Sequence, residues 1–493
     1  MGRVIGIIVV LAIAILLSVF TCKSKGSDLL KWIGIVLFVA FALTWVLPYG
    51  QFQGATFYEY GMNRLGFADI PNILYYSIYF CLTTIIYLLV LGGFYGVLSK
   101  TKGYSALVNK FAKSIKNKEV LVTILMTIIL VALTAILKTQ YILLIFVPFL
   151  ISVLLNAKFD KLSAFSITFG SLLVGSLAAV YGTDGLYWFN NYASTKVTVG
   201  IIHRLILGII ALILFTVLNA LRVAKFVKKN KKNNSDLEND PYEVIEVKGK
   251  NRIWPTIVVF TILFIVIILG YTNWETNFNI EAFSKFHTWL TGLTIGKDFT
   301  IFSYILGTNA VALGSFEIST AVIILLVLTP IIALANRMNA SDFAKNFGEG
   351  FNKMFKPIVL YVLAYSVFIV TYLTPFMTYI SDWAFGLTKK FNPYIVTLTS
   401  FVTSIFHSDL GYTSYLMSGY LSGNYAENYT LAHTLYISTY GLVQVLMPTS
   451  GLLLIGLSYL KIDYKKWFKH IWLFALIMLV VILIYATIVA YAM

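Results

Sequence analysis

The stretch VLMPTSGLLL, residues 445 to 454, lies inside a long apolar run and places proline, threonine, serine and glycine next to one another. As one helix, the run from 429 to 460 would be about 48 Å long, which is too long for an untilted membrane span. Pro448 removes a backbone donor, and Gly451 permits the dihedral angles of an unwound segment. Unwound backbone at membrane depth persists only when it is buried in protein or lines a watery cavity. The stretch therefore predicts a broken helix that lines a site, with a packed proline kink as the alternative.

The composition supports a membrane protein. The chain has 493 residues, of which 59% are hydrophobic and 12% charged. Apolar runs of about 18 residues or more recur along the whole chain, and each can cross the bilayer as a helix. Most of these runs lack the polar face of a soluble helix, and they do not alternate as barrel strands do. The sequence predicts an all-α polytopic membrane protein.

The net charge of +16 comes from lysines and arginines that lie mainly in the loops between apolar runs. This is the pattern of cytoplasmic loops, so we expect a multi-pass protein of the bacterial cytoplasmic membrane, with the lipid bilayer and not nucleic acid as its partner. Cys22 and Cys81 are too few for a disulfide framework or a metal site. The chain carries no nucleotide-binding signature, so we expect neither ATP-driven transport nor a bound cofactor.

The loop charges divide the chain into four parts. Residues 1–21 form an extra first helix, for which a signal sequence is the alternative. Residues 22–221 form a first transmembrane repeat, 222–252 a charged cytoplasmic linker, and 253–493 a second repeat. Within the second repeat, residues 339–356 are amphipathic and predict a helix on the cytoplasmic surface. The apolar segment 357–378 predicts a separate crossing helix.

Each repeat contains a segment with a polar turn, followed by an interrupted helix and a final helix. The first repeat has a hairpin at about 120–156 and a broken helix at about 163–199. The second has a hairpin at about 395–424 and a broken helix at about 429–460. By their loop charges the two units start on opposite sides of the membrane, which indicates an inverted-topology repeat. Charge does not decide whether 120–156 is a re-entrant hairpin or two full crossings, because both return the chain to the same side.

Several blocks resemble one family of carriers. QVLMPTSGLLLIGLSYLKIDYKKWFK (444–469) is similar to the C-terminal motif of the YfcC family, which is classed with anaerobic C4-dicarboxylate carriers in the ion transporter superfamily. WVLPYGQFQGATF (45–57), GGFYGVLSKTKGY (92–104) and FVPFLISVLLNAKFDKLSA (146–164) resemble further family blocks, and they occur in family order. The likeness covers most of the chain after the first helix.

The resemblance implies a scaffold and a transport unit in which two re-entrant hairpins and two broken helices meet near mid-membrane. There they hold the substrate and the coupling ion, which is sodium or a proton, and the carrier forms a homodimer. Carried over by position, the binding residues are those of the two hairpin tips and the two helix breaks. They are Lys138, Thr139, Gln140, Tyr141, Gly182, Thr183, Asp184, His407, Ser408, Asp409, Gly411, Tyr412, Thr413, Gln444, Pro448, Thr449, Ser450 and Gly451.

The chain departs from the family pattern at both tips, at the first break and at Gln444, where the family usually places an asparagine. Relatives have glycines and an acidic pair at the first tip, where this chain has Lys138, Gln140 and Tyr141. The usual asparagine-proline of the first break is Gly182-Thr183, and the proline-serine-glycine-serine-glycine of the second tip is the segment 407–411. Because basic groups replace acidic ones, we expect a changed substrate or coupling ion.

The charged residues that could bind the substrate or the coupling ion are Lys138 and two aspartates. A lysine near mid-membrane needs a partner, and a substrate carboxylate or Asp409 would serve. In two full crossings it would be an ordinary lysine of an outer turn. Asp184 and Asp409 hold matching places in the repeats and could bind sodium or carry a proton, unless both lie in interfacial loops. His407 could relay protons, or simply hydrogen-bond beside its turn.

The sequence therefore predicts an ion-coupled secondary active transporter of a small carboxylated solute: an amino acid, a short peptide or a dicarboxylate. Unwound helix ends would offer N–H groups to the carboxylate and carbonyls to the cation. One alternative is a membrane-embedded enzyme, although His407 and Asp409 are two residues apart and no nucleophile motif is present. The other is a descendant that no longer transports and acts in sensing or assembly.

Overall fold

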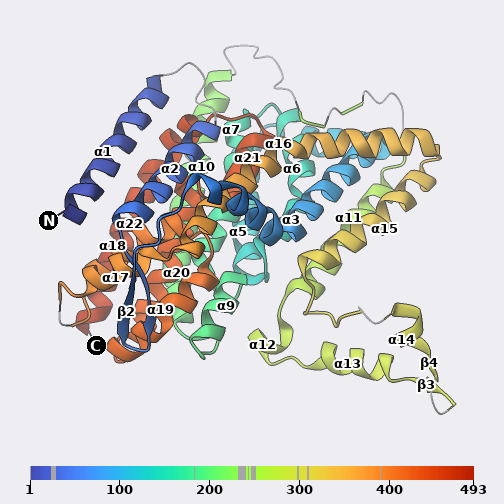
Figure 1. Cartoon of the computed structure of the whole chain (residues 1–493). Coiled ribbons are helices and arrows are strands. Elements are labelled where there is room, and N and C mark those ends of the chain that lie inside the picture. The colour runs from blue at the N-terminus through green and yellow to red at the C-terminus, as the bar shows by residue number, and fades with distance from the viewer. Residues whose placement is uncertain are drawn as a thin grey trace.

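The computed structural model describes residues 2–23, 29–182, 184–230, 240–242, 244–245, 251–296, 299–307, 310–388 and 390–492. Among these residues, ten helices are long and apolar enough to cross a membrane. Figure 1 shows them packed into one bundle, from which the segment after α11 protrudes. The protein is a multi-pass membrane protein, as its apolar runs predict.

The first half of the chain begins with two helices and a short β-hairpin and ends with the long helix α10. Its elements are α1 (Gly2–Lys23), α2 (Leu29–Val46), β1 (Tyr49–Gln53), β2 (Thr56–Gly61), η1 (Phe67–Asp69), α3 (Ile70–Leu98), α4 (Lys102–Ile115), α5 (Glu119–Ile136), η2 (Gln140–Ile145), α6 (Val147–Asn156), α7 (Lys161–Phe165), the π-helical turn η3 (Ser166–Gly170), α8 (Ser171–Ala178), α9 (Asp184–Tyr192) and α10 (Ile201–Asn230).

The second half has the same order of hairpin, broken helix and final helix. Its elements are α11 (Trp254–Tyr271), α12 (Trp274–Phe278), α13 (Ala282–Thr291), β3 (Thr294–Ile295), β4 (Phe299–Thr300), α14 (Ile301–Leu306), α15 (Ile318–Ala335), α16 (Ala340–Leu373), α17 (Phe376–Phe385), α18 (Pro393–Phe406), α19 (Leu410–Asn424), α20 (Tyr429–Leu446), α21 (Gly451–Tyr459) and α22 (Tyr464–Ala492).

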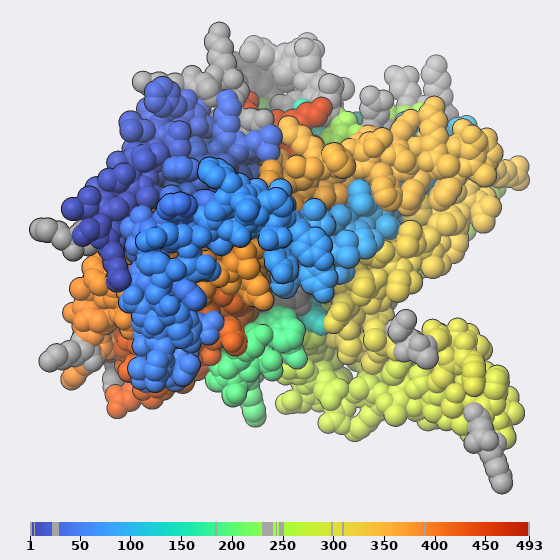
Figure 2. All heavy atoms as spheres, viewed as in Figure 1, coloured from blue at the N-terminus to red at the C-terminus, as the bar shows by residue number. Residues whose placement is uncertain are grey.

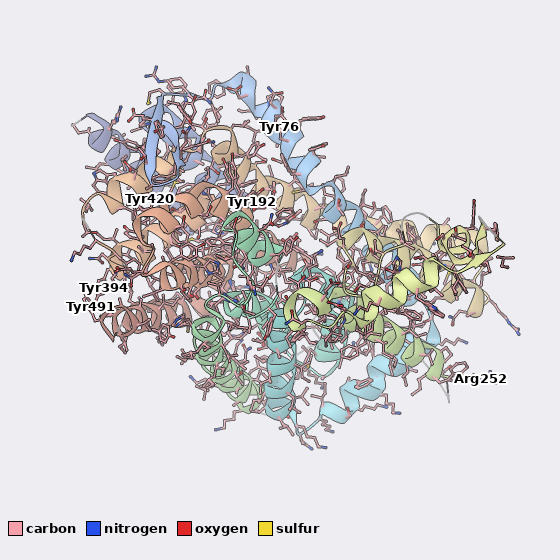
Figure 3. The ribbon with its side chains drawn as sticks, turned by 90° about the horizontal axis from the view of Figure 1, so that it is seen from below. Tyr76, Tyr192, Arg252, Tyr394, Tyr420 and Tyr491 are labelled. Atoms are coloured by element: carbon pink, nitrogen blue, oxygen red, sulfur yellow. The ribbon has the colours of Figure 1, made fainter. Side chains whose placement is uncertain are left out.

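The four interrupted segments have the predicted form. Helices α5 and α6 make the first hairpin with η2 between them, and α18 and α19 make the second. Helices α8 and α9 are the two parts of the first broken helix, and α20 and α21 those of the second. Seen from below in Figure 3, Tyr192 at the end of α9 lies near the middle of the molecule, whereas Arg252, just before α11, lies at its periphery.

Helix α16 corrects one prediction. The segments 339–356 and 357–378 were expected as a surface helix and a separate crossing helix, but one helix runs through Pro357 to Leu373. Its first half packs on α3, because Gly92 and Gly96 let the backbone of Gly350 come into direct contact. That contact holds one side of the amphipathic segment against α3.

The first residues of the predicted charged linker belong to a helix, and two described residues farther along it contact the bundle. Helix α10 continues to Asn230, inside the predicted linker 222–252, of which residues 231–239, 243 and 246–250 lie outside the described part of the chain. Tyr242 is fully buried, and its hydroxyl donates to the carbonyl of Gly92 at 3.2 Å. The ammonium of Lys353 donates to the carbonyl of Pro241 at 2.7 Å. Pro241 and Tyr242 thus attach the linker to α16 and α3, respectively.

The segment from α12 to α14 stands apart from the bundle in the space-filling view (Figure 2). It belongs to the stretch 272–316, between the apolar helices α11 and α15. Its helices are short, and the ion pair of Glu281 with Lys285 at 2.6 Å is exposed. Helix α12 contacts the first broken helix, since Asn277 donates to the carbonyl of Tyr181 at 3.3 Å and the rings of Tyr181 and Phe278 lie 4.8 Å apart. Helices α13 and α14 bury no residue and contribute little to the packing of the bundle.

Candidate functional site

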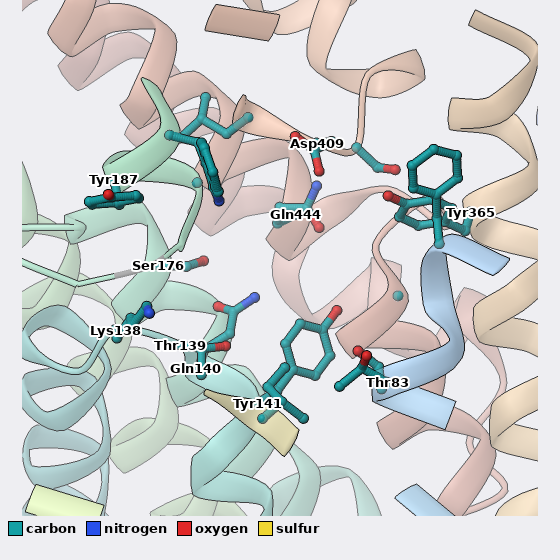
Figure 4. Close-up of a pocket in the computed structure, with 18 of the residues that line it drawn as sticks. Thr83, Lys138, Thr139, Gln140, Tyr141, Ser176, Tyr187, Tyr365, Asp409 and Gln444 are labelled. Atoms are coloured by element: carbon teal, nitrogen blue, oxygen red, sulfur yellow. The ribbon is translucent and has the colours of Figure 1, made fainter. Parts of the chain in front are cut away.

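A cavity of about 740 Å³ lies where the two hairpin tips and the two broken helices meet. Figure 4 shows Lys138 at one side and Asp409 at another, with Gln444, Tyr141 and Tyr365 also facing the space. Both hairpin tips and the second break thus share one cavity with Ser176 and Gly185, which flank the first break, so the predicted segment 120–156 is a re-entrant hairpin and not two full crossings. The lining residues are Phe80, Thr83, Thr84, Lys138, Thr139, Gln140, Tyr141, Ser176, Gly185, Tyr187, Trp188, Phe316, Glu317, Ile318, Tyr361, Tyr365, Ser408, Asp409, Leu410, Tyr440, Gln444, Thr449 and Gly451.

The first hairpin tip is fixed from two sides. Helix α5 ends because Leu137 turns to an extended conformation, and the N–H of Lys138 donates to the carbonyl of Tyr271 at 2.8 Å. On the other side, the hydroxyl of Tyr87 on α3 donates to the carbonyl of Tyr141 at 3.1 Å. The tip is therefore held between α11 and α3, and its side chains are presented to the cavity.

Lys138 has a partner that the sequence did not indicate. Its ammonium lies 4.0 Å from the carboxylate of Glu317, the residue just before α15. The Glu317 side chain is 73% exposed, so water screens the pair and its contribution to stability is below about 1 kcal/mol. The ion pair replaces Asp409 as the protein partner of this lysine.

The second hairpin tip presents a carboxylate. Asp409 caps α19, and its Oδ1 accepts the N–H of Tyr412 at 2.8 Å. The hydroxyl of Tyr440 on α20 donates to the carbonyl of Ser408 at 2.8 Å, which holds the tip against that helix. Asp409 forms no ion pair with any residue that the structure describes.

The second break is the stretch PTSG. Helix α20 ends where Met447 becomes extended, and the hydroxyl of Ser450 accepts the N–H of Leu453 at 3.4 Å to start α21. Gly451 faces the ring of Tyr361 so closely that a Cβ there would collide with it. The glycine is therefore needed for a close approach, and the break lines a cavity as its sequence predicts.

Three buried polar side-chain atoms of cavity-lining residues have no hydrogen-bond partner. They are the Oε1 of Gln140, the Nε2 of Gln444 and the Oγ1 of Thr449. Gln444 is 5% exposed and Thr449 is 1% exposed. Because a buried polar group without a partner costs about 1–3 kcal/mol, such atoms are expected where a ligand completes them.

Several helices begin at this cavity. Gly185, Leu410 and Gly451 line it from the first turns of α9, α19 and α21. Helix N-termini carry free N–H groups and a partial positive charge, which favour an anion. The caps of α19 and α15 are the carboxylates Asp409 and Glu317, whereas α21 is capped by the neutral Ser450. Among these three caps, that of α21, next to Thr449, is therefore the best suited to a ligand carboxylate.

The first break is closed by a buried arginine. Helix α8 ends at Ala178, and the next residue, Ala179, has a φ of 31°. The guanidinium of Arg204, on α10, donates to the carbonyl of Ala179 at 3.0 Å and to that of Val180 at 3.1 Å. It also donates to the carbonyls of Val197 and Val199, and the side chain is fully buried. The unwound carbonyls of this break are thus satisfied by the protein itself.

The structure separates the predicted site residues into two groups. The first group lines the cavity: Lys138, Thr139, Gln140, Tyr141, Ser408, Asp409, Gln444, Thr449 and Gly451. The second group does not. Gly182 donates its N–H to Ala135, and His407 is buried beside the ring of Tyr412. Thr183 and the side chain of Asp184 lie outside the described residues and belong to neither group. The remaining members of the second group are Gly411, Tyr412, Thr413, Pro448 and Ser450.

Other lining residues could not be found from motifs. Thr83 and Thr84 come from α3, Tyr361 and Tyr365 from α16, and Glu317 from the start of α15. Only tertiary packing brings these scaffold helices to the site. Tyr440 could have been predicted to line the site, because it lies one helical turn before Gln444 and so shares its face of α20. No sequence pattern singled out Arg204.

A bundle with two re-entrant hairpins and two broken helices around one polar cavity has the architecture of a secondary transporter. The family model of the C4-dicarboxylate anaerobic carriers matches residues 1–492, and the chain belongs to that family. It is therefore a membrane transporter. Among solved structures, the YdaH transporter of Alcanivorax borkumensis is 12% identical over 94% of this chain and 98% of that chain, with a TM-score of 0.37, a likeness too weak to carry an argument. No curated protein sequence matches the chain.

Proposed function

We propose that the protein is a secondary active transporter that moves a small carboxylated solute through the cavity, driven by a sodium or proton gradient. The observation that supports the proposal is that unpaired polar atoms of Gln444 and Thr449 lie near the N-terminus of α21, whose capping residue, Ser450, is uncharged. The amide of Gln444 and the hydroxyl of Thr449 can both donate to a carboxylate, and free N–H groups of α21 lie beside them. A carboxylate bound there satisfies groups that are otherwise buried without a partner.

The family is named for C4-dicarboxylates, which are solutes of this class. The basic tip residue Lys138 and the amide Gln140 add donors at the opposite part of the lining. A coupling cation would use oxygen atoms, of which the cavity offers the carboxylate of Asp409, the carbonyl side of Gln140 and the unwound backbone. The identity of the cation, and the homodimer that the family resemblance implies, stay predictions.

The test is uptake into proteoliposomes with an imposed sodium or proton gradient and a panel of amino acids and dicarboxylates. We expect gradient-driven accumulation of at least one solute, and a lower rate of uptake at low solute concentration in Thr449→Val and Gln444→Met. Thr329→Val is a matched control: Thr329 is also 1% exposed, but it lies outside the cavity and its hydroxyl is bonded to Leu325. The proposal fails if folded protein transports nothing in the panel, or if the control lowers uptake as much as the cavity variants do.

A further inference from the structure

The cavity opens toward one end of the bundle. Three of its lining residues are exposed there: Tyr187 and Trp188 on α9, and Glu317, which directly follows the stretch 272–316. Figure 1 shows α9 and α12 at this end and the first half of α16 at the other. Because a transporter opens its cavity to the two sides of the membrane in turn, the elements at the other end must separate at some stage.

An apolar seam lies beyond the cavity, where α3 and α16 meet the first hairpin and α21. Its residues are Leu88, Leu91, Leu144, Val147, Pro148, Phe169, Met354, Ile455 and Tyr459. The space between them is about 10 Å³, no more than one water molecule needs. The seam is therefore shut, and it is the place where the bundle must part for the cavity to open at its other end.

Three helices run from the cavity through the seam to the contacts of the linker. The residues of cavity, seam and linker contact, in that order, are Thr84, Leu88 and Gly92 on α3, Tyr361, Met354 and Lys353 on α16, and Gly451, Ile455 and Tyr459 on α21. In each helix the first and the last of these residues are eight positions apart, which is about 12 Å at 1.5 Å per residue. The linker thus contacts all three helices at one level, directly beyond the seam.

Tyr242 of the linker lies across the end of the seam. Its hydroxyl donates to the carbonyl of Gly92 on α3 at 3.2 Å, and its ring lies 6.2 Å from the ring of Tyr459 on α21. The ammonium of Lys353 on α16 lies 4.3 Å from the centre of the Tyr242 ring and also donates to the carbonyl of Pro241. One buried side chain therefore contacts both sides of the seam, and α16 holds it in place.

The hydroxyl of Tyr459 shows that the shut seam has a cost. This hydroxyl is buried without a hydrogen-bond partner, although the ring of Tyr242 lies close to its own ring. A buried hydroxyl without a partner is unfavourable, and it regains partners when water reaches it. Separation of the seam would admit water, so other contacts must hold the seam shut, and the linker supplies such contacts.

We propose that Pro241 and Tyr242 form a latch that holds the seam shut, and that they leave their place beside α3 and α21 before the cavity opens toward the linker. The inference rests on the transporter class of the family and on no particular solute or cation. The segment between the two repeats then regulates how often the cavity opens at this end.

The experiment measures how readily a reagent reaches the seam and the cavity from each side of the membrane. One reporter is Ile455→Cys, in the buried seam, and the other is Ser176→Cys, in the cavity lining. Each is made in the full-length protein that also carries Cys22→Ala and Cys81→Ala. A membrane-impermeant maleimide is added to vesicles of either orientation. We expect the Ser176→Cys reporter to react from the side opposite the linker, and the Ile455→Cys reporter to react slowly, from the linker side.

Two variants release the latch in different ways. Tyr242→Ala removes the ring, whereas Lys353→Met removes the ammonium that holds the ring and leaves the buried seam intact, because Lys353 is exposed. We expect faster labelling of the Ile455→Cys reporter from the linker side, by at least about 10-fold for Tyr242→Ala and about 3-fold for Lys353→Met. Lys356→Met removes an exposed lysine one turn farther along α16 and should leave the rate unchanged.

Three outcomes would overturn the latch. The first is an unchanged rate in both variants. The second is a faster rate in Tyr242→Ala alone, because the void left by the ring could admit the reagent, whereas Lys353→Met leaves no void. The third is labelling of the Ser176→Cys reporter from the linker side alone, which would place the closed end elsewhere. The assay needs no solute, so failure of the latch and failure of the proposed uptake are distinguishable.

Discussion

The two broken helices end in similar unwound segments, but different chemistry satisfies the carbonyl groups that they expose. At the first break a buried guanidinium, Arg204, holds the carbonyls of Ala179 and Val180. At the second break neutral groups do so: the hydroxyl of Tyr464 donates to Leu446 at 2.7 Å, and the indole of Trp467 donates to Val445 at 3.0 Å.

The capping residues hold matching places in the two halves. Arg204 is the fourth residue of α10, and Trp467 is the fourth residue of α22. Each final helix therefore closes the break before it with a side chain from its first turn. Arg204 supplies several donors and a permanent positive charge at the first break, whereas the donors at the second break are uncharged. The comparison shows that the repeat sets the position of the side chain that donates to the unwound carbonyls. The type of residue at that position decides whether the donor is charged.

Removal of the arginine should have the largest effect. Arg204→Met leaves several buried carbonyls without a donor, and we expect a loss of about 3–5 kcal/mol of stability. Arg204→Lys keeps the charge but not the planar fork, so its loss should be intermediate. Thermal unfolding of the detergent-purified protein measures both. A methionine variant as stable as the wild type would show that the break does not need the guanidinium.

Substitutions of the uncharged donors at the second break should lower stability less than Arg204→Met does. Trp467→Phe keeps most of the buried ring but removes the donor to Val445, and Tyr464→Phe removes the donor to Leu446. Each leaves one carbonyl unpaired, at a cost of about 1–3 kcal/mol. The same unfolding measurement should rank both above Arg204→Met in stability. The reverse order would break the comparison between the two closures.

Thr449→Val tests whether the hydroxyl of Thr449 stabilises the second break or binds the solute. The Thr449 hydroxyl is buried without a partner, so an isosteric methyl group should raise stability by about 1 kcal/mol. If the hydroxyl donates to the solute, solute affinity should fall about 10-fold at the same time. Unfolding and uptake are measured on one preparation, with Thr329→Val as the control. A drop in stability together with unchanged uptake would assign Thr449 to the fold.

The smallest effect is expected at the first tip. Lys138→Met removes an ion pair of 4.0 Å whose acidic partner is mostly exposed, so stability should change by less than about 1 kcal/mol. Solute binding should change more than stability does, because the tip lines the cavity. A large loss of stability would show that the charge of Lys138 fixes the tip, as that of Arg204 fixes the first break.

Much of the fold could be predicted because lipid imposes it. A segment in hydrocarbon must satisfy its own backbone, so long apolar runs become helices, and Pro448 with Gly451 marks a place where protein must take over. The hairpin tips and the second break were therefore found, and nine residues named from them line the cavity. The division into separate helices 339–356 and 357–378 was wrong, because an amphipathic segment and the apolar segment after it can form one continuous helix.

The sequence by itself determined the membrane-spanning class, the places where helices break and the family, since each depends on local composition or on the order of motifs. Tertiary structure alone decided which groups meet. It paired Lys138 with Glu317, brought Tyr365 of α16 to the cavity beside Asp409, and buried Arg204 against the first break. These contacts join residues far apart in the chain, and their energies depend on distance, burial and charge, which no single segment contains.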